Sequence, residues 1–289
     1  MSQAITITSR PDGVAVLTFD QPGSKANVLT RELWKEFGDA LTNLATRTDL
    51  KGLVLASAKP GIFIAGADLK LLASAPGPND PEVRAFIEQG LRVLEQLEAL
   101  PFPTCAVIDG AALGGGLEVA LACDYRICGS NPKIQLGLPE VKLGLVPGWG
   151  GTQRLPRLLG VANALAAMHS GAPVAPVEVA AVVSSDGLIE QAAEAITRHD
   201  WRSIRNIRKA AISPDNRMSD DFYENVREAV PQMYEESVTA RLAVLEVVYQ
   251  GGSLPLYDAI KLETEAFMRL AGSDESKRLI AEFFASRKK

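Results

Sequence analysis

The sequence predicts an α/β fold that ends in a helical C-terminal region. Short apolar runs of strand type alternate with segments of helical periodicity over the first two thirds of the chain. Parallel strands need helical crossovers, so this alternation favours an α/β arrangement. After Glu190 the sequence becomes helical and charged. We therefore expect an α/β core over residues 1–195, which would hold the active site, and a helical region over residues 196–289.

The predicted core begins with a hairpin and continues with buried strands. Residues 5–7 and 14–18 alternate as strands do, and they flank the turn residues 10–13. Thr30 is suited to cap a helix in which Leu33 and Phe37 start an apolar stripe. The remaining elements expected in the core are strands at 52–56, 104–108, 125–128 and 134–138 and helices at 83–97, 115–121 and 162–169.

The helical region carries three further candidate helices. Their periodicity predicts helices over residues 201–211, 220–240 and 258–288, with the sequence 251–255 as a break. Their apolar faces require a partner. The sequence allows two arrangements, in which this region either folds back on the core or packs against a second subunit.

Composition excludes several classes of protein. Apolar residues make up 47% of the 289 residues, and charged residues 22%, as in soluble globular proteins. The 30 Lys and Arg against 35 Asp and Glu give a net charge of −5, which offers no electrostatic case for nucleic-acid binding. The N-terminus lacks the apolar block of a signal peptide, and no stretch reaches the length of a membrane span. We expect a cytoplasmic protein.

Cysteine and histidine are scarce. The three cysteines (Cys105, Cys123 and Cys128) form no CxxC pair, and only His169 and His199 could complete a zinc site or a catalytic triad. A disulfide framework and a structural zinc site are therefore not expected. Neither histidine has a nucleophile motif nearby, which favours surface or capping roles for both.

Three glycine-rich turns are the places where chemistry is expected. Two of them, at residues 62–68 and 109–118, pass from a strand through a small-residue turn to a helix, and the third combines residues 138–141 with 147–154. Three consecutive glycines (114–116) at a helix start are costly, at roughly 1 kcal/mol each relative to Ala. They indicate a close approach of the backbone, and free N–H groups at a helix N-terminus can stabilise an oxyanion. The alternative is a tight turn packed against a neighbour. No GxGxxG fingerprint of a dinucleotide site occurs.

Two glutamates beside these turns are candidate acid and base. Glu118 falls in the first turn of an apolar helix, and Glu140 follows Pro139 in an apolar stretch. Each alone is compatible with a structural role, such as complementing a helix dipole. Together, and without a competent His or Cys, they favour general acid–base catalysis. Asp68 is expected to cap a helix, and Asp124 to make a structural hydrogen bond.

At these residues the sequence resembles the enoyl-CoA hydratase/isomerase (crotonase) superfamily. The motifs Ile64–Asp68, Ala112–Glu118 and Leu138–Glu140 with Pro147–Leu155 come in the order and spacing of that family. The similarity is greatest to the hydratase domain of fatty-acid oxidation complex α-subunits, through Ser24–Leu29 and residues 263–277. The resemblance implies a spiral of ββα turns closed by a helical C-terminal region that mediates trimer contacts. A homotrimer or a dimer of trimers is expected.

The resemblance also implies roles for individual residues. Ala67 and Gly115 would present N–H groups to a thioester oxygen, and Glu118 and Glu140 would form the acid–base pair. Lys25 and Lys70 would be phosphate partners of CoA. The positions expected to bind substrate or CoA are Lys25, Ala26, Val28, Ala65, Gly66, Asp68, Leu69, Lys70, Gly114, Pro139, Gly148 and Trp149.

The expected activity is hydration of a 2-enoyl-CoA thioester, with no metal and no cofactor other than the CoA of the substrate. Trp149 is bulkier than the family's usual residue and would reshape the acyl pocket, and Pro176 would shorten the helix that follows. Two alternatives stay open: a 3,2-enoyl-CoA isomerase, or a non-catalytic subunit that binds acyl-CoA. The basic stripe formed by Arg202, Arg205, Arg208 and Lys209 is the only feature that suits RNA, and we expect it to be a solvated helix face.

Overall fold

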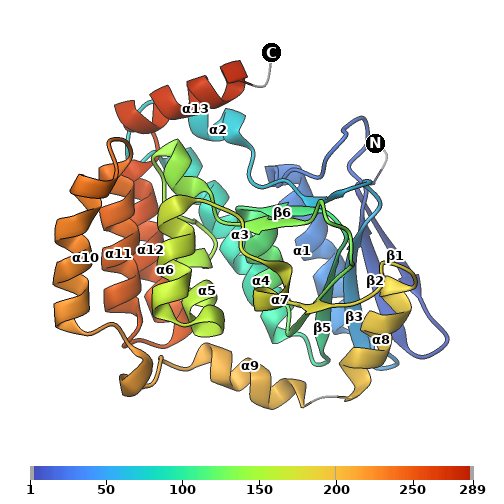
Figure 1. The fold of residues 1–289 in the computed structure, drawn as a ribbon. Helices are drawn as coiled ribbons and strands as arrows, with labels where there is room; N and C mark the ends of the chain where they lie inside the picture. Colours follow the sequence, from blue (N-terminus) through green and yellow to red (C-terminus); the bar gives the residue numbers. More distant parts are fainter. Residues whose placement is uncertain (1–2, 199, 287–289) are drawn as a thin grey trace. The chain divides into compact units, whose positions relative to one another are not determined.

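The computed structural model describes residues 3–198 and 200–286 (Figure 1). The chain forms two compact, discontinuous units. Unit 1 comprises Met1–Ala67, Gln89–Leu136 and Val174–Ile207, and unit 2 comprises Asp68–Glu88, Gly137–Pro173 and Arg208–Lys289. The expected boundary at residue 195 divides the chain in another way and stays a prediction. His199 lies outside the described residues.

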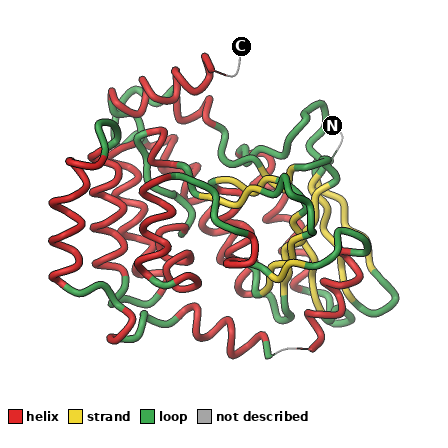
Figure 2. Tube along the Cα trace, in the orientation of Figure 1, coloured by secondary structure: helices red, strands yellow, loops and turns green. Residues whose placement is uncertain are grey.

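Unit 1 contains a six-stranded sheet with the strand order β1-β2-β3-β5-β7-β9. Its strands are β1 (Ile5–Ser9), β2 (Val14–Phe19), β3 (Gly52–Ser57), β5 (Thr104–Ile108), β7 (Tyr125–Cys128) and β9 (Ala181–Val182). The hairpin β1–β2 is antiparallel as predicted, and every other pair in this sheet is parallel. Figure 2 shows these strands in yellow beside the helices of the unit.

A second, three-stranded sheet has the order β4-β6-β8. Its strands are β4 (Ile62–Ile64), β6 (Ala111–Leu113) and β8 (Gln135–Gly137). The chain therefore repeats one pattern three times: a strand of the large sheet, then a strand of the small sheet, then a helix. The helices are α2 (Leu69–Ala73), α4 (Gly115–Ala122) and the 3₁₀ helix η1 (Glu140–Leu143). This is the predicted spiral of ββα turns.

Helices cover both faces of the large sheet in unit 1. Val14, Val16 and Val54 point to the face covered by α8 (Leu188–Arg198), where they meet Ala192 and Ile196. Gly52 allows this contact, because a Cβ there would lie 2.7 Å from Ile196 Cγ2. Phe19 points to the other face, and its ring meets Phe37 of α1 (Arg31–Ala45) edge-on at 5.1 Å. Period-two alternation thus fills both faces with apolar side chains.

Unit 2 is helical apart from its loops. Besides α2 and η1 it holds α5 (Gly151–Leu159), α6 (Val161–Ser170), η2 (Pro214–Asn216), α10 (Asp220–Met233), α11 (Val238–Gly251), α12 (Leu256–Leu270) and α13 (Asp274–Ser286). Helices α10, α11 and α12 lie side by side (Figure 1), and α11 also packs on α6. Because α12 contacts α5, and α13 contacts both η1 and α2, the C-terminal helices fold back on earlier parts of the same chain.

The remaining helices are α3, α7 and α9. Helix α3 (Pro81–Ala99) contributes residues to both units, and α7 (Pro176–Val179) is a single turn with Pro176 at its start, as expected for a helix shortened there. Helix α9 spans Trp201–Lys209. No helix among residues 3–198 and 200–286 is long and apolar enough to cross a membrane.

Two of the predicted C-terminal helices were too long, because each segment contains a break. The segment predicted as one helix over 220–240 is broken between Met233 and Val238, where Ser237 adopts a left-handed conformation at φ 55°. The segment predicted over 258–288 is broken between α12 and α13, where Gly272 has φ +81°. Apolar periodicity continues across both breaks, so the pattern alone did not locate them.

Candidate functional site

The glycine turn before α4 is a close contact between two backbones in unit 1. Gly114 ends β6 in a conformation that only glycine adopts easily (φ 55°, ψ −127°). A Cβ on Gly116 would lie 2.1 Å from the carbonyl oxygen of Ile64, so a larger residue does not fit there. The packing interpretation of these glycines is therefore correct for Gly116. Gly115 is the first residue of α4, where helix geometry gives its N–H no partner.

The turn that contains Ala67 lies beside this helix start. A Cβ on Gly66 (φ +103°) would lie 3.2 Å from Leu113 O, immediately before the glycines. The turn is held from the other side, because Ala65 N–H donates to Asn27 O and Leu29 N–H donates to Gly66 O, both at 2.9 Å. Within the described part of the chain, the N–H groups of Ala67 and Gly115 donate no hydrogen bond.

The two glutamates differ in their surroundings. Glu118 lies in the first turn of α4, where all eight residues are buried, and its own exposure is 1%. Glu140 is the first residue of η1 and is half-buried, with its Oε2 atom shielded from solvent. Glu118 belongs to unit 1 and Glu140 to unit 2.

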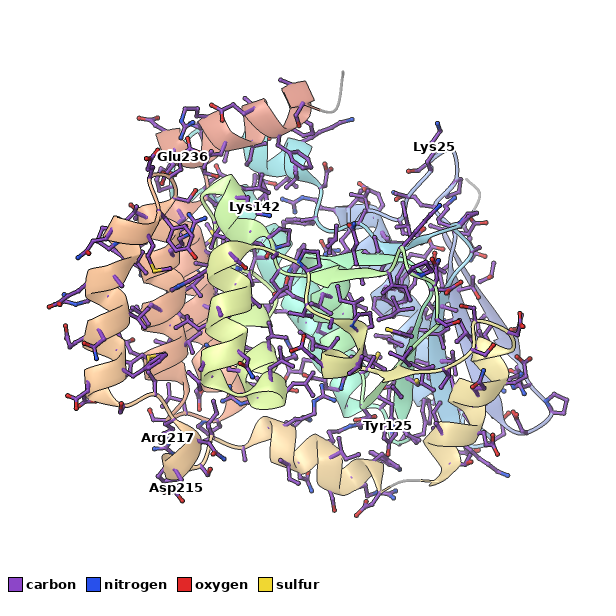
Figure 3. All side chains as sticks on the ribbon, in the orientation of Figure 1. Lys25, Tyr125, Lys142, Asp215, Arg217 and Glu236 are labelled. Atoms are coloured by element: carbon purple, nitrogen blue, oxygen red, sulfur yellow. The ribbon has the colours of Figure 1, made fainter. Side chains whose placement is uncertain are left out.

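The expected CoA-binding residues of unit 1 lie on a loop with internal hydrogen bonds. Ser24 Oγ donates to Ala26 O at 2.7 Å, and Val28 N–H donates to the Gln21 side chain at 2.9 Å. Lys25 is exposed and projects from this loop (Figure 3). The loop lies against the Ala65–Ala67 turn, because the backbone hydrogen bonds of Asn27 and Leu29 join the two segments.

The expected binding residues of unit 2 have largely structural contacts. Asp68 caps α2 as predicted, because its side chain accepts from Lys70 N–H at 3.0 Å. Leu69 and Lys70 begin that helix, and Lys70 is exposed. Pro139 precedes η1 as its N-cap residue.

Trp149 is buried in unit 2. Its Nε1–H donates to Ile87 O at 3.1 Å, and its ring meets Phe86 edge-on at 5.3 Å. Gly148 leaves room for Ile87 and Phe267, to which a Cβ would come within 3.1 Å. The bulky indole is thus fixed in one orientation by a hydrogen bond and by its packing.

Two supporting residues were not singled out from the sequence. Asn27 is fully buried, and its amide donates to Phe63 O at 3.0 Å and to Ser57 Oγ at 2.9 Å, which fixes the strand before Ala65. Glu263 is also fully buried, and its carboxylate accepts from Gly150 N–H and from the N–H and hydroxyl of Thr152 at the start of α5. Both stand among other polar residues in the sequence, so no local signal distinguished them.

Two expectations for charged residues were wrong. His169 is 5% exposed rather than on the surface, and its Nε2 lies 3.0 Å from Arg241 O. Burial lowers its pKa to about 4. Arg205 is not on a solvated face: its guanidinium contacts Asp124 at 2.5 and 2.8 Å and the carbonyls of Leu100 and Phe102. The structural role predicted for Asp124 is correct.

The cysteines and acids provide no second centre among the described residues. Burial raises the pKa of Cys105 and raises that of Cys128 to about 12, so neither thiol is activated. No group of three or more His, Cys, Asp or Glu side chains in residues 3–198 and 200–286 is arranged to hold a metal ion.

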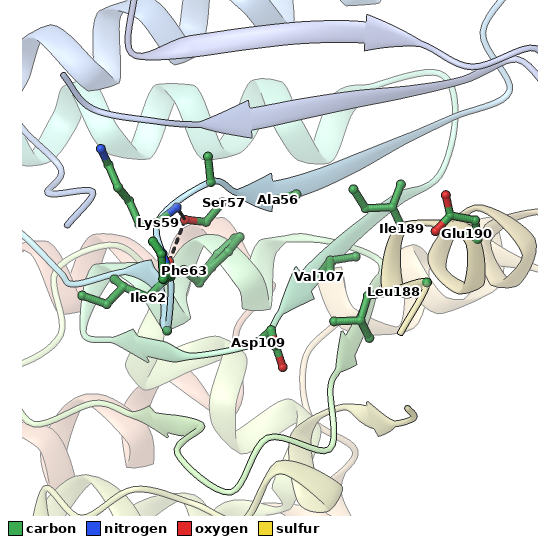
Figure 4. A pocket seen from close by; sticks show the side chains of 14 residues that line it. Ala56, Ser57, Lys59, Ile62, Phe63, Val107, Asp109, Leu188, Ile189 and Glu190 are labelled. Atoms are coloured by element: carbon green, nitrogen blue, oxygen red, sulfur yellow. Dashed lines mark hydrogen bonds between the residues drawn. The ribbon is translucent and has the colours of Figure 1, made fainter. Parts of the chain in front are cut away.

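A cavity of about 400 Å³ lies elsewhere in unit 1, where β3 and β5 end and α8 begins (Figure 4). Its charged lining residues are engaged within the unit: Lys59 Nζ contacts Gln21 O and Asp20, and Asp109 accepts from Ser185. None of the predicted site residues lines it.

The spiral of ββα turns is a crotonase-type fold. A family model described as enoyl-CoA hydratase/isomerase matches residues 9–236. The chain belongs to the enoyl-CoA hydratase/isomerase family, which confirms the resemblance seen in the sequence and places it in that class of enzymes.

Similar proteins agree with this assignment. The chain is 36% identical over 302 residues to the fatty acid oxidation complex subunit alpha of Shewanella halifaxensis, covering 99% of this chain and 41% of that relative. It thus spans about two fifths of that relative's length. The crystal structure of an enoyl-CoA hydratase from Bacillus anthracis has 27% identity, covers 99% of this chain and 97% of its own, and superposes with a TM-score of 0.61. An enoyl-CoA hydratase from Bacillus halodurans, at 19% identity and a TM-score of 0.70, shares the fold.

Proposed function

We propose that the chain is an enoyl-CoA hydratase that adds water across the 2,3 double bond of a 2-enoyl-CoA thioester. The observation that carries the proposal is the pair of N–H groups, on Ala67 and Gly115, that two adjoining turns leave without acceptors. Family membership gives the class of reaction. The names of the curated relatives favour a substrate of the fatty-acid oxidation type.

The proposed roles follow from where charge develops. As water adds to C3, negative charge builds on the thioester oxygen, and Ala67 and Gly115 would donate to that oxygen. Glu118 would accept a proton from the water, and Glu140 would give a proton to C2. The buried surroundings of Glu118 suit a group that must act away from bulk solvent. The loop of Lys25, Ala26 and Val28, the Ala65–Gly66 turn and α2 would bind CoA.

The proposed reaction is redox-neutral, since one water is added and nothing is oxidised or reduced. We therefore propose that it uses no redox cofactor and no metal, and that CoA takes part only as a portion of the substrate. Turnover should then be unchanged after dialysis against a chelator. A loss that added divalent metal restores would contradict this.

The test of the proposed function follows the absorbance of the conjugated thioester in crotonyl-CoA and in a longer 2-enoyl-CoA. We expect rapid loss of absorbance with the wild-type protein, and a loss slowed by about 10²–10⁴-fold in Glu118→Gln and in Glu140→Gln, the range typical of general acid–base groups. Wild-type rates in either variant would remove that residue from the pair. Comparison of the two substrates would show which acyl length the protein prefers.

An isomerase is the second candidate, since one carboxylate can suffice to move a double bond. The presence of both glutamates favours hydration. A 3-enoyl-CoA substrate distinguishes the two activities: a hydratase leaves it largely unchanged, whereas an isomerase converts it to the conjugated thioester. Binding of an acyl-CoA without conversion of either substrate would indicate a non-catalytic subunit.

We further propose that the protein forms a homotrimer, or a dimer of trimers, in the cytoplasm. The family resemblance supports both proposals. Light scattering after gel filtration should give three or six times the mass of the chain, and cell fractionation should place the protein with cytoplasmic enzymes. A monomer in solution, or recovery in another fraction, would contradict the respective proposal.

A further inference from the structure

The helix that carries Glu140 is too short to hold itself in place. Helix η1 has four residues, Glu140–Leu143, which is a single 3₁₀ turn. A run of this length does not persist without support, because its few hydrogen bonds do not offset the cost of ordering the chain. The position of the Glu140 carboxylate therefore depends on what packs against η1.

Gly144 closes the turn. It adopts a left-handed conformation (φ 66°), and its N–H donates back to Glu140 O and Val141 O. Leu145 N–H also donates to Glu140 O, at 3.1 Å. Two of the bonds that fix the backbone of Glu140 thus come from the residues at and just after this glycine.

Helix α13 packs directly on Gly144. A Cβ placed on Gly144 would lie 3.3 Å from the Cα and the backbone nitrogen of Ser276 and 3.3 Å from Leu279 Cδ1. Ser276 is fully buried, and its hydroxyl finds no hydrogen-bond partner among the described residues. Because the hydroxyl makes no hydrogen bond, we infer that this position requires a small side chain and not a polar one.

Helix α13 is itself anchored at its start within unit 2. Lys277 Nζ donates to Pro76 O at 2.7 Å, and Ser237 N–H donates to the Glu275 side chain at 3.0 Å. Before the helix, Gly272 packs so closely on Gly77 that a Cβ would lie 2.4 Å from Gly77 O. These contacts make α13 a fixed surface rather than a free end.

The end of helix α6 supports η1 as well. Gly171, which ends α6, leaves room for the Lys142 side chain, whose Cε would lie 2.9 Å from a Cβ there. Figure 3 shows Lys142 in this part of unit 2. Helix η1 therefore has α6 and α13 as supports, and α13 comes from a distant part of the sequence.

We propose that Gly144 and Ser276 are positioning residues for Glu140: their backbone-to-backbone contact seats η1 on α13 and sets where the Glu140 carboxylate lies. The inference rests on the proposed hydratase function. Because Ser276 is fully buried and its backbone contacts Gly144, a larger side chain there must displace a neighbour, and we expect η1 to move and to carry the carboxylate with it. Helix α2 also contacts α13, so a rise in KM without a loss of kcat would show that α2 moves instead and would overturn the inference.

The test compares Ser276→Leu with Ala281→Leu, which makes the same kind of enlargement on the exposed side of the same helix. Ser276→Leu should lower kcat for crotonyl-CoA by on the order of 10²-fold, as expected for misplacing a catalytic group by about 1 Å, with KM changed little. Ala281→Leu should keep wild-type turnover. Ser276→Ala, which keeps the side chain small, should also keep wild-type turnover. If Ser276→Leu does not fold, Ser276→Thr adds a single methyl group at the same place.

A double-mutant cycle with Glu140→Gln separates positioning from general damage. If Ser276 acts through Glu140, Ser276→Leu should lower the residual rate of the Glu140→Gln protein by less than about twofold. The same large loss in both backgrounds, or an equal loss in Ala281→Leu, would overturn the inference. Wild-type turnover by Glu140→Gln alone would remove Glu140 from the acid–base pair and overturn the inference with it, whereas no hydration of crotonyl-CoA by the wild-type protein would overturn the proposed function.

Discussion

Glu118 and Glu140 stand on helices that are stabilised in different ways. Helix α4 in unit 1 has eight residues, all buried, and begins at a glycine turn seated on the neighbouring strand β4. Helix η1 in unit 2 has four residues and is supported by α6, which follows it closely in the sequence, and by α13, more than a hundred positions later. A buried helix of two turns holds the first carboxylate, whereas a single turn that depends on two other helices holds the second. Stability and activity should therefore respond differently to mutations in the two units.

The largest expected effect on stability is in unit 1, at the far end of α4. Arg205→Met breaks the buried pair with Asp124, which follows that helix, and should lower the free energy of unfolding by about 4 kcal/mol, as is typical when one partner of a buried pair is lost. The contact lies at the end of α4 opposite Gly115, so kcat of the folded protein should change by less than about twofold. Denaturant unfolding together with crotonyl-CoA assays measures both.

Arg202→Met is the matched control for this prediction. Arg202 lies on the same helix but is exposed, with its guanidinium over the Trp201 ring at 4.3 Å. Its loss should change the unfolding free energy by less than about 1 kcal/mol. Equal destabilisation by the two variants would mean that the Asp124 pair is not what holds α9.

The next effect should appear at the glycine turn, where stability and activity fall together. Gly116→Ala places a methyl group 2.1 Å from Ile64 O. Because this oxygen belongs to the backbone of β4, it cannot move aside as a flexible side chain would. We expect a loss of about 3 kcal/mol in unfolding free energy and a lower kcat even in the folded fraction, because α4 must move away from β4. Thermal unfolding and turnover report the two effects.

The control is Gly77→Ala, because a Cβ on Gly77 has open space around it. That variant should fold and turn over as the wild type does. A Gly116→Ala protein with wild-type stability would show that α4 is not tightly packed on β4, and the contrast between α4 and η1 would lose its basis.

A smaller effect concerns pH and unit 2. Burial among Arg241 and Tyr234 lowers the folded-state pKa of His169 from 6.5 to about 4, so the neutral ring is the form the folded state favours. The stabilisation is complete above pH 6.5, the unfolded-state value, and is lost as the pH falls toward 4. At pH 4.5 the loss should reach about 2 kcal/mol.

Denaturant unfolding at pH 7 and at pH 4.5 measures this loss. His169→Gln lacks the titrating group, so its unfolding free energy should fall less between these two pH values than that of the wild type. Parallel pH profiles for the two proteins would show that His169 is not the group responsible.

Much of the fold could be predicted from local patterns, because strands and short helices are encoded in neighbouring residues. The buried strands, the Thr30 and Asp68 caps and the start of α4 at Gly115 were predicted correctly. The breaks near Ser237 and Gly272 were not, since apolar spacing continues across them. Single left-handed residues decide such breaks, and Ser237 gives no composition signal of its own.

The candidate site was less accessible to sequence reasoning because its supports are distant in the chain. The sequence places Arg205 in a basic stripe, and only the fold shows that it pairs with Asp124. The sequence favours a surface position for His169, and only the fold shows that α11 covers it. Glu263 and Asn27 become informative only when their backbone partners at Thr152 and Phe63 are known. Patterns identify which residue types carry chemistry, whereas the groups that position them come from the fold.

The central claim is that the two glutamates have separate tasks, Glu140 at C2 and Glu118 at the water. Exchange of the C2 protons of butyryl-CoA in deuterium oxide tests this most directly, because exchange needs a proton-transfer group at C2 and no water addition. The wild-type protein and Glu118→Gln should both catalyse exchange, and Glu140→Gln should be slower by about 10²-fold or more. Undiminished exchange by Glu140→Gln, or its loss in Glu118→Gln alone, would contradict the assignment of Glu140 to C2.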